Sequence, residues 1–162
     1  MPATSIRLVA DTNVILRGLL NARSASGRVL ELIEQRRVVV LVSNPVLSEY
    51  RTVLTDPAII NRYPVLTLER VEVALRRFRY VGDYLRVVRT KFEFARDPRD
   101  AMLLELAISG KATDLVSNDN DLLSLPSAHT DAAKRLRQRL PGLRIANPPA
   151  FLQGNSNLLS AE

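Results

Sequence analysis

Short apolar runs alternate along the chain with longer segments in which apolar residues recur at helical spacing. The runs at 6–10 and 38–42 are almost continuously apolar, which is typical of strands buried on both faces. Weaker runs at 85–89, 113–117 and 143–146 predict three further strands. Helices are predicted between these strands, at 12–21, 26–36, from 45 onwards, 67–81, 98–109 and 130–139. This alternation favours an α/β fold in which helices cover one parallel sheet.

Two of the predicted helices begin with residue types that cap a helix N-terminus. Asn44 is expected to cap the helix after the second strand, with Pro45 at its first position. The segment 97–100 (Asp-Pro-Arg-Asp) opens the most apolar helix, with Asp97 as the cap and an acidic residue three positions later. Because a helix this apolar is buried, its first turn is expected to face the edge of the sheet.

The chain is expected to form a single domain. Its 162 residues match the usual length of one domain, and no internal repeat, low-complexity tract or interdomain linker interrupts them. The predicted domain covers residues 1–152, and the polar tail at 153–162 is expected to fray.

Composition excludes several kinds of site. With no cysteine, the chain has no disulfide, thiolate zinc site or cysteine nucleophile, which fits a reducing environment. The single histidine, His129, cannot build a histidine-rich zinc site. The first residues carry no secretory leader pattern, and no apolar run approaches the ~20 residues of a membrane span. We therefore expect a cytoplasmic protein with no membrane partner.

Acidic residues follow the predicted strands at the points where those strands end. Asp11 follows the first strand, and Asp119 follows the strand at 113–117, with Asp121 two residues further on. Because the carboxyl ends of parallel strands meet at one edge of a sheet, Asp11 and Asp119 are expected to lie close together. Clustered carboxylates repel one another unless a cation neutralises them, and a site of oxygen ligands alone favours Mg²⁺ or Mn²⁺. This pattern predicts a metal-dependent phosphoryl-transfer site, with a nuclease as the leading interpretation.

The other acidic residues each have a structural explanation as well. Glu49 lies at the margin of an apolar helix face, where it could equally reach water and pair with an arginine. Asp100 fits the acidic position of a helix-capping arrangement, and Asp121 could cap a short helix at 122–125. Taken singly, these residues do not decide between a structural and a functional role.

Three uncharged polar residues lie next to these carboxylates. Thr12 and Asn13 follow Asp11, and Ser117 lies two residues before Asp119. Their hydroxyl and amide groups are predicted to support the site by orienting carboxylates or a phosphate. Asn13 could instead cap the first helix.

The net charge of +6 adds a second line of argument, because an acidic site leaves the positive charge on other surfaces. Arginine outnumbers lysine, and its planar guanidinium suits bidentate contacts with phosphate. The basic helix at 130–139 carries Arg135 and Arg137, which are predicted to bind nucleic acid. A solvated basic surface explains the charge equally well, and only its coincidence with the carboxylates favours nucleic acid.

Taken in order, these motifs resemble those of the PIN (PilT N-terminal) domain family. The matching segments are 9–14 (VADTNV), 43–49 (SNPVLSE), 97–100 (DPRD) followed by 104–107 (LELA), and 116–123 (VSNDNDLL). The resemblance spans roughly residues 6–152 and is greatest to the toxins of toxin–antitoxin modules. It implies a three-layer α/β/α sandwich around a parallel β-sheet and a Mg²⁺- or Mn²⁺-dependent endoribonuclease.

The resemblance also implies roles for individual residues and a set of partners. The implied catalytic residues are Asp11, Glu49, Asp100 and Asp119. The implied metal ligands are Asp11, Asp100 and Asp119, with Asp121 as a less constant addition. The expected substrate is RNA in single-stranded form, and an antitoxin protein is a further expected partner. A second copy of the chain could pair through the apolar segments 19–20 and 65–66.

Two functions of other classes compete with the nuclease. A dehalogenase-like phosphatase also places an aspartate after its first strand, but it needs a second aspartate two residues later, where this chain has Asn13. A non-catalytic RNA-binding or interaction module would be favoured by an incomplete acidic set. The set is complete, so the metal-dependent nuclease is preferred.

Overall fold

The computed structural model describes residues 5–86, 88, 91–92 and 97–160, and in this part of the chain five strands form one parallel sheet. The strands are β1 (Arg7–Ala10), β2 (Val39–Ser43), β3 (Asp83–Leu85), β4 (Asp114–Val116) and β5 (Arg144–Ala146). The helices are α1 (Thr12–Leu20), α2 (Ala25–Glu34), α3 (Asn44–Leu54), α4 (Pro57–Arg62), α5 (Leu68–Val81), α6 (Pro98–Ser109), α7 (Asn120–Leu123), α8 (Asp131–Arg139), α9 (Pro148–Gly154) and α10 (Asn157–Ser160), with a 3₁₀ turn η1 at Leu125–Ser127. The order across the sheet is β3-β2-β1-β4-β5.

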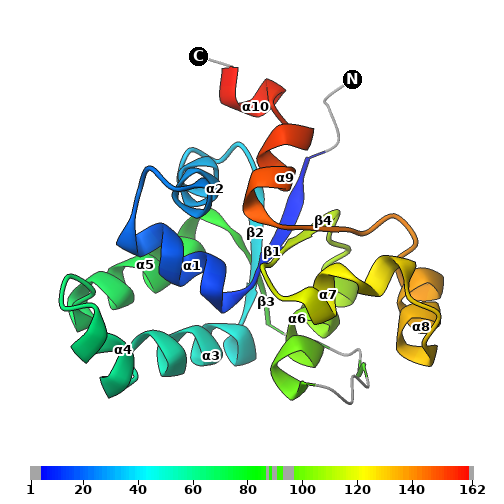
Figure 1. Cartoon of the computed structure of the whole chain (residues 1–162), viewed down its shortest axis with the longest axis horizontal. Coiled ribbons are helices and arrows are strands. Elements are labelled where there is room, and N and C mark those ends of the chain that lie inside the picture. Colours follow the sequence, from blue (N-terminus) through cyan, green and yellow to red (C-terminus); the bar gives the residue numbers. More distant parts are fainter. Residues whose placement is uncertain (1–4, 87, 89–90, 93–96, 161–162) are drawn as a thin grey trace.

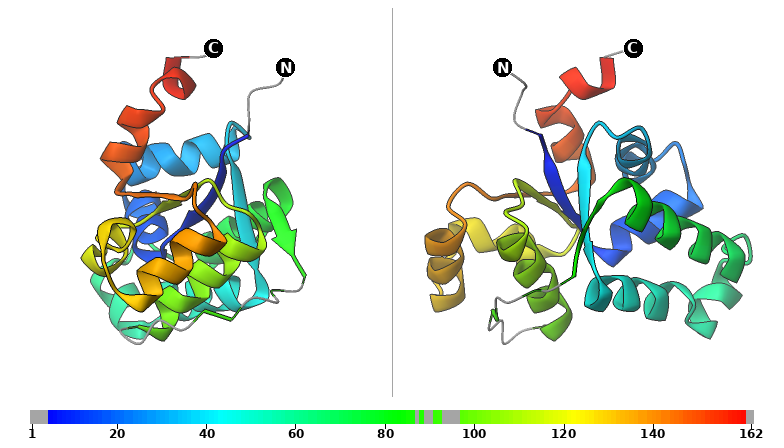
Figure 2. Two further views of the ribbon diagram at one scale, coloured as in Figure 1. Left: turned by 90° about the vertical axis from the view of Figure 1, so that its right-hand side faces the viewer. Right: turned by 180° about the vertical axis from the view of Figure 1, so that it is seen from behind.

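Helices cover both faces of this sheet, so the fold is a three-layer α/β/α sandwich, as the sequence predicted. Figure 1 shows α1, α2 and α5 on one side of the strands and α6 on the other. Helix α5 packs on β2 and β3, whereas α6 packs on β1 and β2. Figure 2, seen from behind, shows the same division, with α8 on the side away from α5.

The core is formed by the apolar runs that predicted the strands. Residues 8–10 of β1 and 40–42 of β2 are completely buried, because helices cover them from both faces. Gly82 connects α5 to β3 at a close approach between backbones. A Cβ atom at this position would lie 2.4 Å from the carbonyl oxygen of Val40, so glycine is required there.

Two local predictions are wrong. The third strand covers Asp83–Leu85 and ends where the predicted strand 85–89 was to begin; residues 87, 89 and 90 lie outside the described part of the chain. Its position is set by pairing with β2, which weak alternation in the sequence does not reveal. The cap of α3 is Ser43, whose hydroxyl accepts a hydrogen bond from the backbone N–H of Val46, and Asn44 is the first helical residue.

The carboxyl ends of β1, β2 and β4 lie at one edge of the sheet and fix the position of the functional site. Ala10 is paired with Val116, so Asp11 and Ser117 leave the sheet side by side. The backbone N–H of Asp11 donates to the Val116 carbonyl at 3.0 Å, which holds the two strand ends together. Helix α3 follows β2 directly and contacts α6, which closes the far side of this edge.

The segment after β5 continues as two short helices, α9 and α10. Phe151 and Leu152 of α9 are buried, and a guanidinium N–H of Arg37 donates to the Leu158 carbonyl at 2.8 Å. The fraying of residues 153–162, and the domain boundary at 152, stay predictions. Within the described residues, none of the helices has the length and apolar character needed to cross a membrane.

Candidate active site

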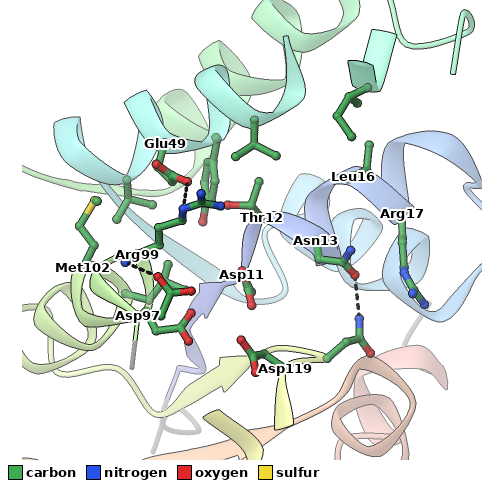
Figure 3. A pocket seen from close by; sticks show the side chains of 17 residues that line it. Asp11, Thr12, Asn13, Leu16, Arg17, Glu49, Asp97, Arg99, Met102 and Asp119 are labelled. Carbon is green, nitrogen blue, oxygen red and sulfur yellow. Dashed lines mark hydrogen bonds and ion pairs between the residues drawn. The ribbon is translucent and has the colours of Figure 1, made fainter. Parts of the chain in front are cut away.

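A cavity of about 500 Å³ opens at the carboxyl edge of the sheet, between α1, α3 and α6. Figure 3 shows the side chains around it, with Asp11 near the centre and acidic groups from three separate segments turned toward one another. The residues that line it are Asp11, Thr12, Asn13, Leu16, Arg17, Val46, Glu49, Tyr50, Val53, Ile59, Asp97, Arg99, Asp100, Met102, Leu103, Asn118 and Asp119. The cavity therefore gathers four predicted carboxylates: Asp11, Glu49, Asp100 and Asp119.

Asp11 and Asp119 are connected through the hydroxyl group of Ser117. This hydroxyl donates to Oδ2 of Asp11 at 2.7 Å and accepts from the backbone N–H of Asp119 at 2.9 Å. Ser117 is completely buried, so its hydroxyl is fixed between the two strand ends. Burial raises the pKa of Asp11 above its ordinary value, while the hydrogen bond from Ser117 opposes this shift.

Asp100 lies in the first turn of α6 and is buried, with 4% of its surface exposed. Its Oδ2 atom has no hydrogen-bond partner among the described residues, which is costly for a buried carboxylate oxygen. Burial, followed by the charges of Asp119, Asp11 and Asp97, raises the pKa of Asp100 to about 7. The protein thus buries Asp100 next to three other acidic residues, and among the described residues no basic side chain forms an ion pair with it.

Asp97 joins this cluster, which the sequence interpretation did not foresee. One carboxylate oxygen from each of Asp97, Asp100 and Asp119 lies within 4.8 Å of the other two. Asp97 is also the cap of α6, as predicted, because its Oδ1 accepts from the backbone N–H of Arg99 at 2.9 Å. A capping carboxylate keeps lone pairs free for a second partner, so the two roles are compatible. The sequence signal for the second role was the three-residue spacing of Asp97 and Asp100.

Glu49 lines the same cavity but is turned toward a different partner. Its Oε1 lies 3.6 Å from Nε of Arg99, and 22% of its side chain is exposed. It is not among the carboxylates whose oxygens meet within 4.8 Å. Glu49 therefore lines the cavity without joining the acidic cluster, and Arg99 lies between it and Asp97 (Figure 3).

The remaining predicted residues divide into two groups. Thr12 and Asn13 line the cavity, and Asn13 Oδ1 accepts a hydrogen bond from Asn118 Nδ2 at 3.3 Å. Asp121 lies outside the cavity lining; its backbone N–H donates to Oδ1 of Asp119, which caps the short helix α7. Asp119 thus fills the capping role that the sequence offered for Asp121.

The predicted nucleic-acid-binding arginines lie on α8, away from the cavity lining. One guanidinium nitrogen of Arg137 donates to the carbonyls of Pro126 and Ala128, which ties α8 to the turn before it. The guanidinium of Arg135 lies 5.9 Å from the centre of the Phe92 ring. The buried residues Ala133 and Leu136 attach this helix to the body of the protein. These contacts give both arginines structural roles, and their binding of nucleic acid stays a prediction.

Tyr50 is a completely buried residue of the cavity wall that sequence reasoning did not identify. Its hydroxyl donates to the carbonyl oxygen of Ala10, the residue that precedes Asp11. Burial, with the nearby charge of Asp11, raises the pKa of Tyr50, so the phenol stays a neutral donor. Tyr50 therefore fixes the end of β1 and, through it, the position of Asp11.

Replacing Tyr50 with phenylalanine is expected to lower the free energy of unfolding by about 1–3 kcal/mol, because the buried Ala10 carbonyl would lose its partner. Chemical denaturation followed by circular dichroism measures this change. Tyr63→Phe serves as the control, because Tyr63 is a partly buried tyrosine outside the cavity lining. Equal stability of the Tyr50→Phe variant and the unaltered protein would show that the hydroxyl does not hold the strand end.

Two further residues of the cavity, Arg17 and Arg99, were also missed. Arg99 is the second residue of α6, and a positive charge in the first turn of a helix opposes the helix dipole. Such a conflict between a residue and its helix is a pattern that can point to a functional residue, and it is visible in the sequence. Arg17 carries no comparable signal, because the helix dipole stabilises a positive charge in the last turn of α1.

The chain is similar to known proteins over most of its length. Residues 7–121 match the sequence model of the family described as PIN domain. An uncharacterised protein of Methanocaldococcus jannaschii is 27% identical over 160 residues, which cover 99% of this chain and 98% of that protein. No solved structure matched the chain. The family match ends before α8 and β5, although β5 pairs with β4 in the same sheet.

Proposed function

Because the chain belongs to the PIN-domain family, we propose that it is a metal-dependent endoribonuclease that hydrolyses phosphodiester bonds in RNA. PIN domains are generally metal-dependent nucleases, and the acidic cluster of this chain is compatible with a metal site. One observation supports the assignment most strongly: the buried Oδ2 of Asp100 has no hydrogen-bond partner among the described residues, and Asp100 lies among other carboxylates. A bound divalent cation would satisfy this oxygen and remove the repulsion.

The chemistry of the ligand atoms favours Mg²⁺ or Mn²⁺. The gathered ligands are carboxylate oxygens, which hard cations prefer, and the cavity contains neither histidine nor cysteine. We assign Asp97, Asp100 and Asp119 as the residues that hold the cation, with Asp11 beside them. When bound, such a cation stabilises the charge that develops on phosphate oxygens and activates the attacking water.

The chain's own residues would orient the site and the substrate. Ser117 holds the Asp11 carboxylate and the Asp119 backbone in one arrangement, and Tyr50 fixes the strand end before Asp11. Glu49 lines the same cavity as the cluster, and we retain it as a catalytic residue that would complete the site after turning from Arg99. Asp121, which supports the cap at Asp119, is proposed only as an outer ligand.

The biological setting belongs to the same proposal. The substrate is single-stranded RNA, since its backbone bends readily into a cavity, and Arg135 and Arg137 offer further positive charge on α8. The protein acts in the cytoplasm as the toxin of a toxin–antitoxin pair.

One of the two apolar segments proposed for pairing with a second copy is 65–66. In this segment Leu66 is fully buried in the core of the chain, whereas Val65 is 58% exposed. Pairing through residues 65–66 would therefore rest on Val65 alone.

Removal of divalent cations is expected to abolish RNA cleavage, and Mg²⁺ or Mn²⁺ is expected to restore it, because the carboxylates would otherwise repel the phosphate. The test incubates the pure protein with a labelled single-stranded RNA in excess EDTA, then with each cation added beyond the chelator. A heat-denatured sample processed in parallel controls for contaminating ribonuclease and for metal-catalysed breakdown. Full cleavage in EDTA by the native protein would exclude the metal-dependent mechanism.

A further inference from the structure

Two arginines line the cavity on opposite sides of Asp11 (Figure 3). Arg17 comes from α1 and Arg99 from the first turn of α6. Figure 3 shows Asp11 between them, with Arg99 on the side of Glu49 and Arg17 beyond Asn13. The described cavity lining contains these two positive side chains and five carboxylates, so both arginines are placed in an acidic cavity, on different sides of Asp11.

Arg99 occupies a position that local helix energetics disfavour. Its charge opposes the dipole of α6, and its guanidinium has one ion-pair partner in the described part of the chain, Glu49. The 3.6 Å separation between Nε and Oε1 is too long for a strong hydrogen bond. The side chain is 70% exposed, so most of its donors face the cavity or solvent and are free to bind an anion.

Arg17 is held over the other end of the cavity by the geometry of α1. It lies four residues after Asn13, so the two side chains share one face of the helix. Asn13 is joined to Asn118 by a hydrogen bond, and this amide pair separates Arg17 from the acidic centre. Arg17 is exposed, and its distance from the carboxylates makes it available to a ligand that extends past them.

We propose that Arg17 and Arg99 bind the phosphates on the two sides of the scissile phosphate in a single-stranded RNA. This inference rests on the proposed function and names how that site holds its substrate. A polyanion that enters an acidic cavity needs positive charge wherever the bound cation does not neutralise it. With a guanidinium on each side of Asp11, the cavity holds a strand that continues in both directions. The strand is therefore cut at an internal bond.

The test compares substrates with and without the flanking phosphates. One is a single-stranded RNA of ten nucleotides, and the other is a dinucleoside monophosphate, whose only phosphate is the scissile one. The variants are Arg17→Gln, Arg99→Gln and Arg99→Lys. Arg23→Gln is the matched control, because Arg23 is an exposed arginine between α1 and α2 that lies outside the cavity lining.

Each glutamine variant is expected to raise KM for the longer RNA by about tenfold, as expected for the loss of one charge-assisted contact. KM for the dinucleotide should change several-fold less. The dependence of log(kcat/KM) on log salt should become shallower by ~0.7 for each contact removed. Arg99→Lys should recover part of the lost affinity, because it retains the charge without the bidentate geometry. Arg23→Gln should leave the KM ratio and the salt dependence unaltered.

Three results would overturn the inference. Equal changes on both substrates, with a lower kcat for the Arg99 variants, would mean that Arg99 acts by holding Glu49. An unchanged salt dependence would mean that neither arginine meets a phosphate. The third result comes from a binding experiment.

Binding of the fluorescent ten-nucleotide RNA, measured by anisotropy in Ca²⁺, separates this inference from the proposed function. Arginine-dependent binding without cleavage would contradict only the nuclease, whereas cleavage with arginine-independent binding would contradict only the phosphate contacts.

Discussion

Replacing Asp11 with asparagine is expected to reduce RNA cleavage by at least ~10²-fold while leaving the fold intact. Asparagine matches aspartate in shape but carries no charge, so it cannot balance a divalent cation. The hydroxyl of Ser117 can still donate to the remaining carbonyl oxygen, and the strand ends should stay together. Burial disfavours the charged form of Asp11, so removing that charge should not destabilise the protein.

The measurement is the initial rate of cleavage of a labelled RNA at saturating Mg²⁺, with the circular dichroism spectrum and Tm recorded for each protein. Asp131→Asn is the matched control, since it makes the same change at an exposed residue of α8 outside the cavity. Cleavage by Asp11→Asn at the rate of the unaltered protein would remove Asp11 from the site. Loss of the folded spectrum would instead identify Asp11 as a structural residue.

The second large effect is expected in the pH dependence of stability. The pKa of Asp100 in the folded protein is raised to about 7, whereas an unfolded aspartate titrates near ~3.9. The folded state therefore binds this proton more tightly, and protonation stabilises the fold. The metal-free protein should lose stability as the pH rises from about 4 to about 7, and its Tm should be lower near pH 8 than near pH 5. A loss of 1 kcal/mol corresponds to about 2–4 °C for a domain of this size.

Divalent cations should reverse this trend. Above pH 7 the ionised cluster binds the cation, and at a hundred times its Kd the cation adds about 2.7 kcal/mol to the stability of the folded state. Near pH 5 the proton on Asp100 competes with the cation, so the added stability should be smaller. Scanning calorimetry across this range, with and without Mn²⁺, measures both effects.

Asp100→Asn isolates the contribution of this residue. In the metal-free variant the fall in Tm between about pH 5 and pH 8 should be reduced, because the titrating carboxyl is gone. The response to Mn²⁺ should weaken as well. Asp83→Asn offers a control at an aspartate of β3 that pairs with Arg7 outside the cavity. If Asp100→Asn and the unaltered protein give the same profile, the buried acid is not the source of the pH dependence.

The proximity of two predicted site residues, Asp11 and Asp119, follows from the sheet. Asp11 and Asp119 each come after a buried apolar run, and parallel strands bring such positions to one edge. Asp100 required more, because its spacing from Asp97 satisfied a helix cap as well as a metal ligand. The structure brings both residues into the same cluster, so its geometry allows the capping role and the proposed ligand role together.

The features of the site and fold that the sequence did not reveal depend on contacts between segments that are distant in the sequence. Tyr50 matches the apolar face of α3, and nothing local shows that its hydroxyl meets the carbonyl of Ala10, forty residues earlier. The pairing of Glu49 with Arg99 likewise joins two helices. The third strand was misplaced because three residues held by pairing with β2 carry too little periodicity to be located alone.

The hydroxyl of Ser117 gives the two halves of the site different stiffness. On one side, the ends of β1 and β4 are joined by the backbone hydrogen bond from Asp11 to Val116 and by the two hydrogen bonds of Ser117, so Asp11 and Asp119 are held in one arrangement. On the other side, Oδ2 of Asp100 is held by no hydrogen bond from the described residues. Adjustment to cations of different radius would then come from the first turn of α6, against a fixed reference formed by the strand ends.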